Sequence, residues 1–411
     1  MENKKINILV MYEDKIGGVG YFRSLNPHIF LGKHYSDDFE VDIVYSYPTA
    51  GDLGDFFDKY DIIQYHKILD PDSKAIDLIR KANPRAKIVC DIDDFYKLPN
   101  HHPNYYGAVV VNKVHEKVLK SLRDVDYITT TTPIFADILK KVNPNVEVLP
   151  NAIDMSDRQF HLNKTKSDRI RFGLVVGSSH LEDIKILKNA INQLSKDVLD
   201  KIQICLCGFN TEGKLTKYDQ NGKPNVREIL PKESVYYEME KILTNNYTTI
   251  SQQHKDFLMR FIPKVKDPFV NEPYTRHWTL PIDSYYQHYN NVDVLLVPLV
   301  ESTFNACKSQ LKLIEAGFAH IPVICQNFGP YTIDSIPFLE KGNTINPEGN
   351  CLLVDTVKNH KMWGRYISIL AEHPEYITQM ADNLAKHIQA NYSIEAVTQK
   401  RAEFYKKIVS E

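Results

Sequence analysis

The clearest indication of the fold is the sequence YDIIQYHKILDPDSKAIDLIRKANPRAKIVCDIDD, residues 60–94. Its two apolar runs, at 60–67 and 86–92, have the length and β-branched content of buried strands. Between them, residues 73–84 place apolar side chains at helical spacing and end at a proline, which indicates an amphipathic helix. Strand, helix and strand in this order predict a βαβ unit with two parallel strands.

The same alternation extends along the chain in both directions. A helix is expected at roughly 107–123, a polar linker at about 155–168, and a second series of strands and helices from residue 170. We therefore predict an α/β protein of two tandem Rossmann-like, doubly wound domains. The expected parts are an N-terminal domain at 1–160, a C-terminal domain at 168–390 with a Tyr-rich insertion at about 209–285, and a terminal helix at 391–411 that could cross back to the first domain.

Composition excludes several classes of protein. The 411 residues carry a formal net charge of −2, with no basic footprint for nucleic acid. The first apolar run is too short for a secretory signal, and no run approaches the roughly 20 residues of a membrane span. The six cysteines lack a disulfide or metal-ligand spacing, so we expect reduced thiols and a cytoplasmic protein.

The last helix leaves one question of location open. It carries four cations, which fit either a solvated helix face or contact with anionic lipid on the inner face of the membrane: Lys400, Arg401, Lys406 and Lys407.

Polar residues that follow strands are the candidates for chemistry, because doubly wound domains bind ligands beyond the carboxyl ends of their strands. In VVGSSHLED, 175–183, Gly177 and Ser178 leave a strand, and Ser179 with Glu182 fits a capping box that starts a helix. Free backbone N–H groups there would suit a phosphate, with His180 as a further donor. The alternative is an ordinary capped helix with a solvated histidine.

A second candidate is STFNACKSQLKLIEAG, 302–317. Lys308 and Ser309 stand where a helix should begin, so a cation and a helix dipole would act on one point. Lys312 and Glu315 follow on one face, and a carboxylate such as Glu315 can accept hydrogen bonds from both hydroxyls of a ribose. The alternative is an amphipathic helix with exposed charges.

Near the N-terminus, Gly17, Gly18 and Gly20 form a turn after the first strand that would let a ligand approach the backbone. Arg23 follows, either as a ligand contact or as a surface residue. The turn is not a G-x-G-x-x-G fingerprint, which argues against a dinucleotide cofactor.

Asp91, Asp93 and Asp94 close the strand at 86–92. They could hold a metal, act as catalytic carboxylates, or form the acidic end of a strand with Asp91 solvated. His102, in the loop that follows, is a candidate on the acceptor side.

Together these motifs resemble the GT-B-fold retaining glycosyltransferases, family 4-like, also called glycosyltransferase group 1. The resemblance covers nearly the whole chain except the insertion. It rests on GGVGYFR (17–23), PNAID (150–154) and VDVLLVPL (292–299) with KSQLKLIEAGFAHIPVI (308–324). The pattern of Gly177, Ser178, His180 and Asp183 is similar to a bacterial and phage-associated branch.

The resemblance implies transfer of a hexose-type sugar from a nucleotide diphosphate sugar to a glycan, a lipid-linked glycan or a protein, with retention and without a metal or other cofactor. Asp93 lies where many relatives carry a sugar-contacting histidine, and under inversion it would be the base. The residues implied are Asp93 and Asp94 as catalytic; Gly18, Gly177, Ser178, His180, Asn305, Lys308, Ser309, Lys312 and Glu315 as donor-binding; and Arg23, Asp91 and His102 on the acceptor side.

Two departures from the family pattern keep alternatives open. Cys307 replaces the first Glu of the usual Glu-x7-Glu, and Lys185 is the only cation near the glycine turn at 177. A sugar-nucleotide epimerase of the same fold, or an inactive sugar-nucleotide-binding relative, therefore remain alternatives. No nucleic-acid partner is expected, and the oligomeric state is not predicted.

Overall fold

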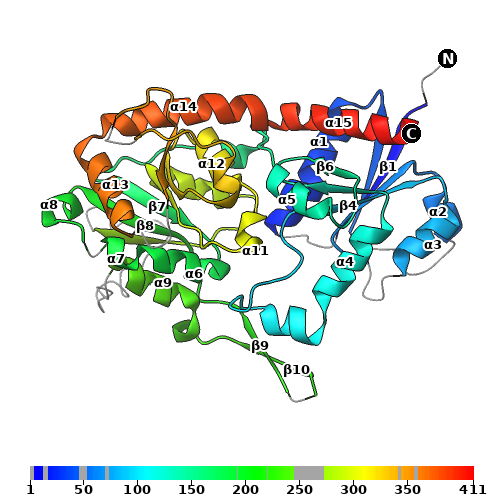
Figure 1. The fold of residues 1–411 in the computed structure, drawn as a ribbon, viewed down its shortest axis with the longest axis horizontal. Coiled ribbons are helices and arrows are strands. Elements are labelled where there is room, and N and C mark those ends of the chain that lie inside the picture. Colours follow the sequence, from blue (N-terminus) through cyan, green and yellow to red (C-terminus); the bar gives the residue numbers. More distant parts are fainter. Residues whose placement is uncertain are drawn as a thin grey trace. The chain divides into compact units, whose positions relative to one another are not determined.

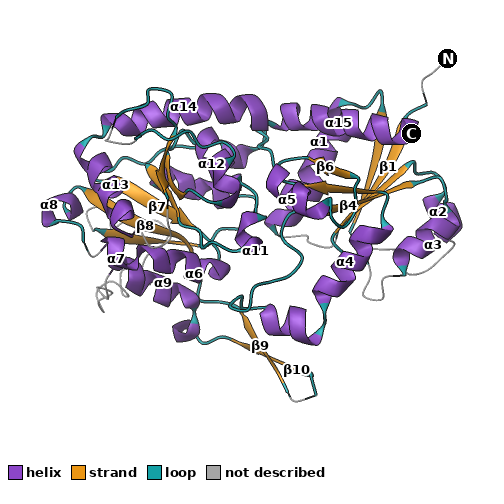
Figure 2. Ribbon diagram, in the orientation of Figure 1, coloured by secondary structure: helices purple, strands orange, loops and turns teal. Residues whose placement is uncertain are grey.

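The computed structural model describes residues 4–12, 17–45, 53–69, 74–191, 193–219, 221–244, 273–340, 344–355 and 360–411. The chain forms two compact units. Unit 1 comprises residues 1–156, 302–314 and 390–411, and unit 2 comprises 157–301 and 315–389. In each unit a layer of strands lies between helices (Figure 2).

Unit 1 is built on a six-stranded parallel sheet in the order β2-β1-β3-β4-β5-β6. Its strands are β1 (Ile6–Met11), β2 (Phe39–Val44), β3 (Ile62–His66), β4 (Lys87–Ile92), β5 (Tyr127–Thr130) and β6 (Val146–Val148).

Alternate residues of these strands enter two different cores, as the pleat requires. Ile8 and Val10 pack with side chains of α1 (Asn26–His34) and α15 (Ile394–Ser410), which lie side by side (Figure 1). Leu9 and Met11 pack with the helices of the other face. Those helices are α2 (Leu53–Phe57), α3 (Ala75–Ala82), α4 (Val114–Asp124) and α5 (Pro133–Leu139).

The helix expected at 107–123 is interrupted. A π-helical segment, η2 (Tyr106–Val111), precedes α4, and Lys113 between them has a left-handed backbone with φ 48°. A left-handed residue cannot continue a right-handed helix, so the prediction of one long helix is wrong. A second π-helical segment, η1 (Gly20–Leu25), leads into α1.

Unit 2 contains the other six-stranded parallel sheet, in the order β11-β8-β7-β12-β13-β14. Its strands are β7 (Ile170–Val175), β8 (Ile202–Phe209), β11 (Tyr274–Trp278), β12 (Val294–Val297), β13 (Val323–Gln326) and β14 (Cys351–Val354). The strand β11 falls inside the expected insertion at 209–285, yet it pairs with β8 as an edge strand. That stretch also holds the antiparallel hairpin of β9 (Lys214–Tyr218) and β10 (Pro224–Glu228), and α9 (Val235–Thr244). Residues 245–272 of the expected insertion lie outside the described residues.

The first helix expected after β7 in unit 2 is broken into short segments. The helical pattern after β7 forms three short turns: α6 (Leu181–Ile184), the 3-10 turn η5 (Lys185–Leu187) and α7 (Lys188–Ile191). The remaining helices are α8 (Lys196–Leu199), α13 (His360–Glu372) and α14 (Glu375–Tyr392), while α11 (Thr303–Ala306) and α12 (Leu311–Phe318) belong to the segment of the second candidate motif.

The terminal helix corrects one further expectation. Arg401 is fully buried in unit 1, so its assignment to a solvated or lipid-facing surface is wrong. Lys400, Lys406 and Lys407 are exposed, and the Lys406 ammonium lies 2.6 Å from a carboxylate oxygen of Asp38. All six cysteines are free and buried. In the part of the chain that is described, no helix has the length and apolar character that a bilayer crossing requires.

Two glycines of unit 2 offer a matched test of this packing. A Cβ added at Gly173 in β7 would lie 2.3 Å from Val292 Cγ2, whereas one added at Gly177 would meet nothing within 4 Å. We expect Gly173→Ala to lower the free energy of unfolding by about 1–3 kcal/mol through overpacking. Gly177→Ala should stay within about 0.5 kcal/mol of the parent. Urea denaturation measures both, and equal losses would contradict the packing described for β7.

Candidate functional site

The carboxyl edge of the unit 1 sheet gathers four polar side chains. His66 ends β3 and Lys67 follows it, while Asp93 and Asp94 follow β4. The two strands are paired neighbours. Because the carboxyl ends of neighbouring parallel strands lie at the same edge, these side chains meet there.

Asp93 is held by two partners at this edge. Its Oδ1 lies 2.8 Å from Lys67 Nζ and 3.0 Å from His66 Nε2, and its side chain is 14% exposed. Burial by itself would disfavour the charged form, but the Lys67 ammonium and the hydrogen bond from His66 outweigh it and hold the pKa of Asp93 well below its ordinary 3.8. Asp93 is therefore ionised across the whole physiological range.

Lys67 reaches Asp93 from an unusual backbone. Its φ is 57°, in the left-handed region that residues other than glycine rarely adopt. Its backbone N–H donates to the carbonyl of Asp91 at 3.0 Å. Burial would lower the pKa of Lys67, yet the carboxylates of Asp93 and Asp94 raise it. A strained residue held in this way is typical of functional sites.

Asp94 differs from its neighbour. Burial and then the Asp93 carboxylate raise the pKa of Asp94 above 3.8, although Lys67 and Lys308 act against the rise. Adjacent carboxylates whose pKa values move apart can take different roles: Asp93 stays charged, and Asp94 more readily holds a proton.

Arg23 and Asp91, a residue near the end of β4, form a buried pair. Arg23 Nη2 and Nε donate to the two oxygens of Asp91 at 2.7 and 3.0 Å, and the side chains are 1% and 0% exposed. The Arg23 guanidinium overcomes the effect of burial and lowers the pKa of Asp91. The interpretations of Asp91 as solvated and of Arg23 as a surface residue are wrong, whereas contact of either with an acceptor stays a prediction.

The segment 302–312 brings further predicted residues into unit 1. Ser309 Oγ accepts a hydrogen bond from Asn151 Nδ2 at 3.0 Å, and Asn151 also accepts one from Arg23. Lys308 Nζ lies 5.4 Å from the centre of the Phe304 ring and is partly exposed.

The remaining predicted residues of unit 1 are placed as follows. Asn305 is 5% exposed, and its backbone N–H donates to Ser302 Oγ at 3.1 Å. The ring of His102 lies 6.0 Å from that of Phe304. Lys312 is partly exposed in the first turn of α12, and Gly18 is partly buried immediately before η1.

Cys307, which replaces the expected glutamate, is part of the apolar core of unit 1. Burial, and to a smaller extent the negative charge of Asp94, raises the pKa of this thiol to about 12. A buried thiol with a raised pKa stays protonated at neutral pH and is a poor nucleophile. The side chain at 307 therefore serves packing.

In unit 2, the turn after β7 differs from the expected capping box. Ser178, Ser179 and His180 form a 3-10 turn, and within the described residues no side chain caps the start of α6, so that prediction is wrong. His180 Nδ1 instead lies 2.9 Å from Asp183 Oδ2, and Asp183 Oδ1 accepts from the N–H of Val300 at 2.8 Å. Asp183 thus fixes both the histidine and the chain after β12.

Glu315 is fully buried in unit 2 and surrounded by tyrosines. Tyr285 donates to its Oε1, Tyr289 donates to its Oε2 at 2.6 Å, and Tyr286 donates to its backbone carbonyl at 2.8 Å. The tyrosines come from the 3-10 helix η7 (Tyr285–Asn291). The exposed helix face expected for Glu315 is therefore wrong, while a role in donor binding stays a prediction.

Sequence reasoning missed four of these residues: His66, Lys67, Tyr285 and Tyr289. His66 and Lys67 stand at the end of a strand that the sequence clearly indicates, and the same rule that selected the aspartates would have selected them. The sequence did not indicate that Tyr285 and Tyr289 bind Glu315, because that partner is 26 or more positions away.

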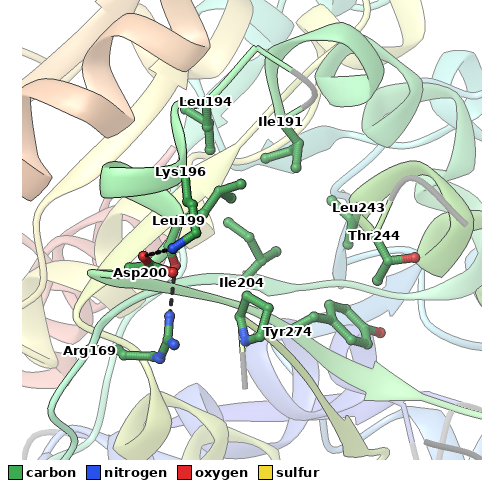
Figure 3. Close-up of a pocket in the computed structure, with 11 residues that line it drawn as sticks. Arg169, Ile191, Leu194, Lys196, Leu199, Asp200, Ile204, Leu243, Thr244 and Tyr274 are labelled. Carbon is green, nitrogen blue, oxygen red and sulfur yellow. Dashed lines mark hydrogen bonds and ion pairs between the residues drawn. The ribbon is translucent and has the colours of Figure 1, made fainter. Parts of the chain in front are cut away.

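The described residues contain no group of three or more His, Cys, Asp or Glu side chains placed to hold a metal. A cavity of about 400 Å³ in unit 2 has a mainly apolar lining, and at its margin Lys196 pairs with Asp200 (Figure 3). Arg169 beside it donates to the carbonyls of Leu199 and Ile202. We assign no chemistry to this cavity.

Comparison with known proteins finds solved structures with a similar fold but low sequence identity to this chain. Neither a scan against protein-family models nor a search of curated proteins finds a match. HepE from Anabaena, in complex with UDP and glucose, matches with a TM-score of 0.60 at 13% identity, over 98% of this chain and 100% of its own.

Two further structures match along nearly their whole length. The catalytic domain of starch synthase IV from Arabidopsis thaliana, bound to ADP and acarbose, has a TM-score of 0.60 at 12% identity, over 100% of both chains. A UDP-forming trehalose-phosphate synthase from Burkholderia xenovorans has a TM-score of 0.55 at 10% identity, over 98% of this chain and 99% of its own. The predicted fold class, two tandem Rossmann-like α/β domains of the GT-B type, is confirmed.

The pair of Lys67 and Asp93 should show strong coupling in a double-mutant cycle of Lys67→Met and Asp93→Asn. We expect a coupling energy of about 1–3 kcal/mol at pH 7, because each single change leaves a largely buried charge without its partner. The folded-state pKa of Asp93 is depressed, so this stabilisation is complete above pH 3.8 and is lost as the pH falls toward the folded-state pKa. Urea denaturation between pH 7 and pH 3 measures the change.

The exposed pair of Lys59 and Asp42, 2.7 Å apart, is the control for this cycle. Its coupling should stay below about 1 kcal/mol, as is usual for surface pairs. Equal coupling in the two pairs would contradict the burial described for Asp93.

Proposed function

We propose that this protein is a glycosyltransferase that moves a sugar from a nucleoside diphosphate sugar to a hydroxyl of a glycan, a lipid-linked glycan or a protein. The observation that carries the proposal is the likeness, along the full length of the chain, to HepE in complex with UDP and glucose and to starch synthase IV bound to ADP and acarbose. The polar side chains at the carboxyl edge of the unit 1 sheet support it, since that edge is where doubly wound domains bind ligands.

In the proposed reaction the bond from the anomeric carbon to the diphosphate oxygen breaks, and a bond from that carbon to the acceptor oxygen forms. We propose retention, with the acceptor proton passing to the departing phosphate on the same face, and no metal. The growing charge on the phosphate would be met by backbone N–H groups near Gly177 and Ser178 of unit 2. Lys308, a partly exposed cation of unit 1, stays a proposed donor-binding residue. His180, oriented by Asp183, is a further donor.

The two aspartates receive different roles in this proposal. Asp93 is locked in its charged form by Lys67 and His66, so it would orient a sugar or acceptor hydroxyl and stabilise positive charge at the anomeric carbon. Asp94 would hold or release a proton beside it. A cytoplasmic location fits six free cysteines, since reducing compartments keep thiols unpaired.

Nucleotide binding is the first test. We expect UDP, ADP or GDP to raise the melting temperature of the parent protein, because a ligand of the folded state stabilises it. Gly177→Ala should weaken that nucleotide's affinity at least about tenfold, because a methyl group would enter the space in which the phosphates approach the backbone. A thermal-shift assay measures the first effect and isothermal titration calorimetry the second. The control for folding is an unchanged melting temperature of ligand-free Gly177→Ala, since its added Cβ meets nothing within 4 Å. Unchanged affinity in Gly177→Ala would remove this turn from the site.

Turnover is the second test. Asp93→Asn should lower kcat by about a hundredfold or more while nucleotide affinity stays within about threefold, because the lost interaction acts mainly in the transition state. Transfer should continue in EDTA, and NMR should show the anomeric configuration of the donor in the product. Full activity in Asp93→Asn would contradict the role of Asp93. A requirement for added Mg²⁺ or Mn²⁺ would contradict the metal-free reaction, and an inverted product would contradict retention.

A further inference from the structure

Glu315 is a buried carboxylate whose two oxygens are both occupied by phenol groups of its own chain. Tyr285 donates to Oε1 and Tyr289 donates to Oε2 at 2.6 Å. Burial, and next the Glu315 carboxylate, raise the pKa of Tyr289 far above its ordinary 10, so this hydroxyl keeps its proton and remains a donor. The carboxylate is satisfied before any ligand arrives.

The two tyrosines are not equivalent. Tyr289 is 0% exposed, and its ring packs on Tyr286 with ring centres 4.8 Å apart. Tyr285 is the first residue of η7 and is partly exposed. Of the two phenols that bind the Glu315 carboxylate, Tyr285 is therefore the one that solvent reaches.

We propose that the Tyr285 hydroxyl is an internal substitute for a ribose hydroxyl, and that nucleotide binding exchanges one for the other on Glu315 Oε1. This inference rests on the proposed function and assigns a specificity-determining role to Tyr285. A phenol and a ribose hydroxyl are both neutral O–H donors to a carboxylate, so the exchange keeps Glu315 hydrogen-bonded throughout. A buried carboxylate that lost a donor without replacement would be strongly destabilised.

The exchange has a measurable consequence for affinity. While Tyr285 occupies Oε1, the protein is not competent to bind ribose there. The apparent affinity is then the intrinsic affinity multiplied by the fraction of molecules in which Oε1 is accessible. Removing the Tyr285 hydroxyl should therefore tighten nucleotide binding and destabilise the free protein. A purely structural tyrosine would give the second effect without the first.

Tyr285→Phe tests this, since it removes the hydroxyl and keeps the ring. We expect its melting temperature to fall in the absence of nucleotide and its affinity for UDP to rise about tenfold over the parent by calorimetry. ADP or GDP replaces UDP as the probe if the parent binds one of them instead.

Tyr289→Phe is the matched control, because it removes the other donor from the same carboxylate at a fully buried position. It should lower the melting temperature without tightening binding. The second control is the 2′,3′-dideoxy form of the same nucleoside diphosphate, which has no ribose hydroxyl to offer. With this probe the gain in Tyr285→Phe should disappear.

The outcomes separate this inference from the proposed function. A parent protein that binds none of the three nucleotides contradicts the proposed function and the exchange with it. A parent protein that binds a nucleotide, with a Tyr285→Phe variant that binds it no more tightly, overturns the exchange alone. A gain that persists with the dideoxy nucleotide also overturns it, because the ribose hydroxyls would then have no part in the effect.

Discussion

Arg23 and Asp91 form the buried ion pair on which the carboxyl edge of the unit 1 sheet depends. The guanidinium comes from η1, which precedes α1, and binds both oxygens of a carboxylate in β4. It also donates to the carbonyl of Leu149 at 2.6 Å and to Asn151, whose amide reaches Ser309. One side chain thus fixes the ends of chain segments that are more than a hundred residues apart.

Burying two charges has a large desolvation penalty, so such a pair is stable only when the other hydrogen bonds of both groups are satisfied. Here they are: Thr129 donates to Asp91 at 2.6 Å, and Arg23 has the carbonyl and the amide as further acceptors. Arg23 is the main partner of Asp91, whereas Lys67 and His66 bind Asp93. The sequence D-I-D-D therefore contains two carboxylates with separate cationic partners and lowered pKa values, Asp91 and Asp93, and one with a raised pKa, Asp94.

The fold was predictable from sequence for a simple reason. Short apolar runs that are bounded by turns alternate with segments of helical periodicity. A parallel sheet covered by helices buries all of these apolar runs, so the alternation predicts that fold. The breaks in helices were not predictable, because apolar side chains every three or four residues, as at Ile184, Leu187 and Ile191, suit both an α-helix and a chain of 3-10 turns. Lys113 gives no local sign of its left-handed backbone, since lysine ordinarily favours helix.

The candidate site was predictable in position but not in detail. Asp93 and Asp94 follow a strand, and strand ends are where ligands bind. The state of each aspartate depends on partners that a single sequence does not reveal: Arg23 is 68 positions from Asp91, and His66 is 27 from Asp93. Polarity alone therefore allowed a solvated Asp91 and a solvated or lipid-facing Arg401, although both are fully buried.

Asp93 and Glu315, one in each unit, meet the same physical requirement. Each is a largely or fully buried carboxylate, and each is already bound to donors of its own chain: Lys67 and His66 for the first, Tyr285 and Tyr289 for the second. A buried charge without donors would be too unstable to keep in a free protein. In the proposed reaction, a substrate hydroxyl that reaches Glu315 would compete with a phenol already in place, and one that reaches Asp93 Oδ1 would share it with Lys67 and His66. The affinity for a substrate at such a site would then depend on the difference between its hydrogen bond to the carboxylate and the internal hydrogen bond that it replaces. The internal donor would therefore influence specificity as much as the carboxylate does.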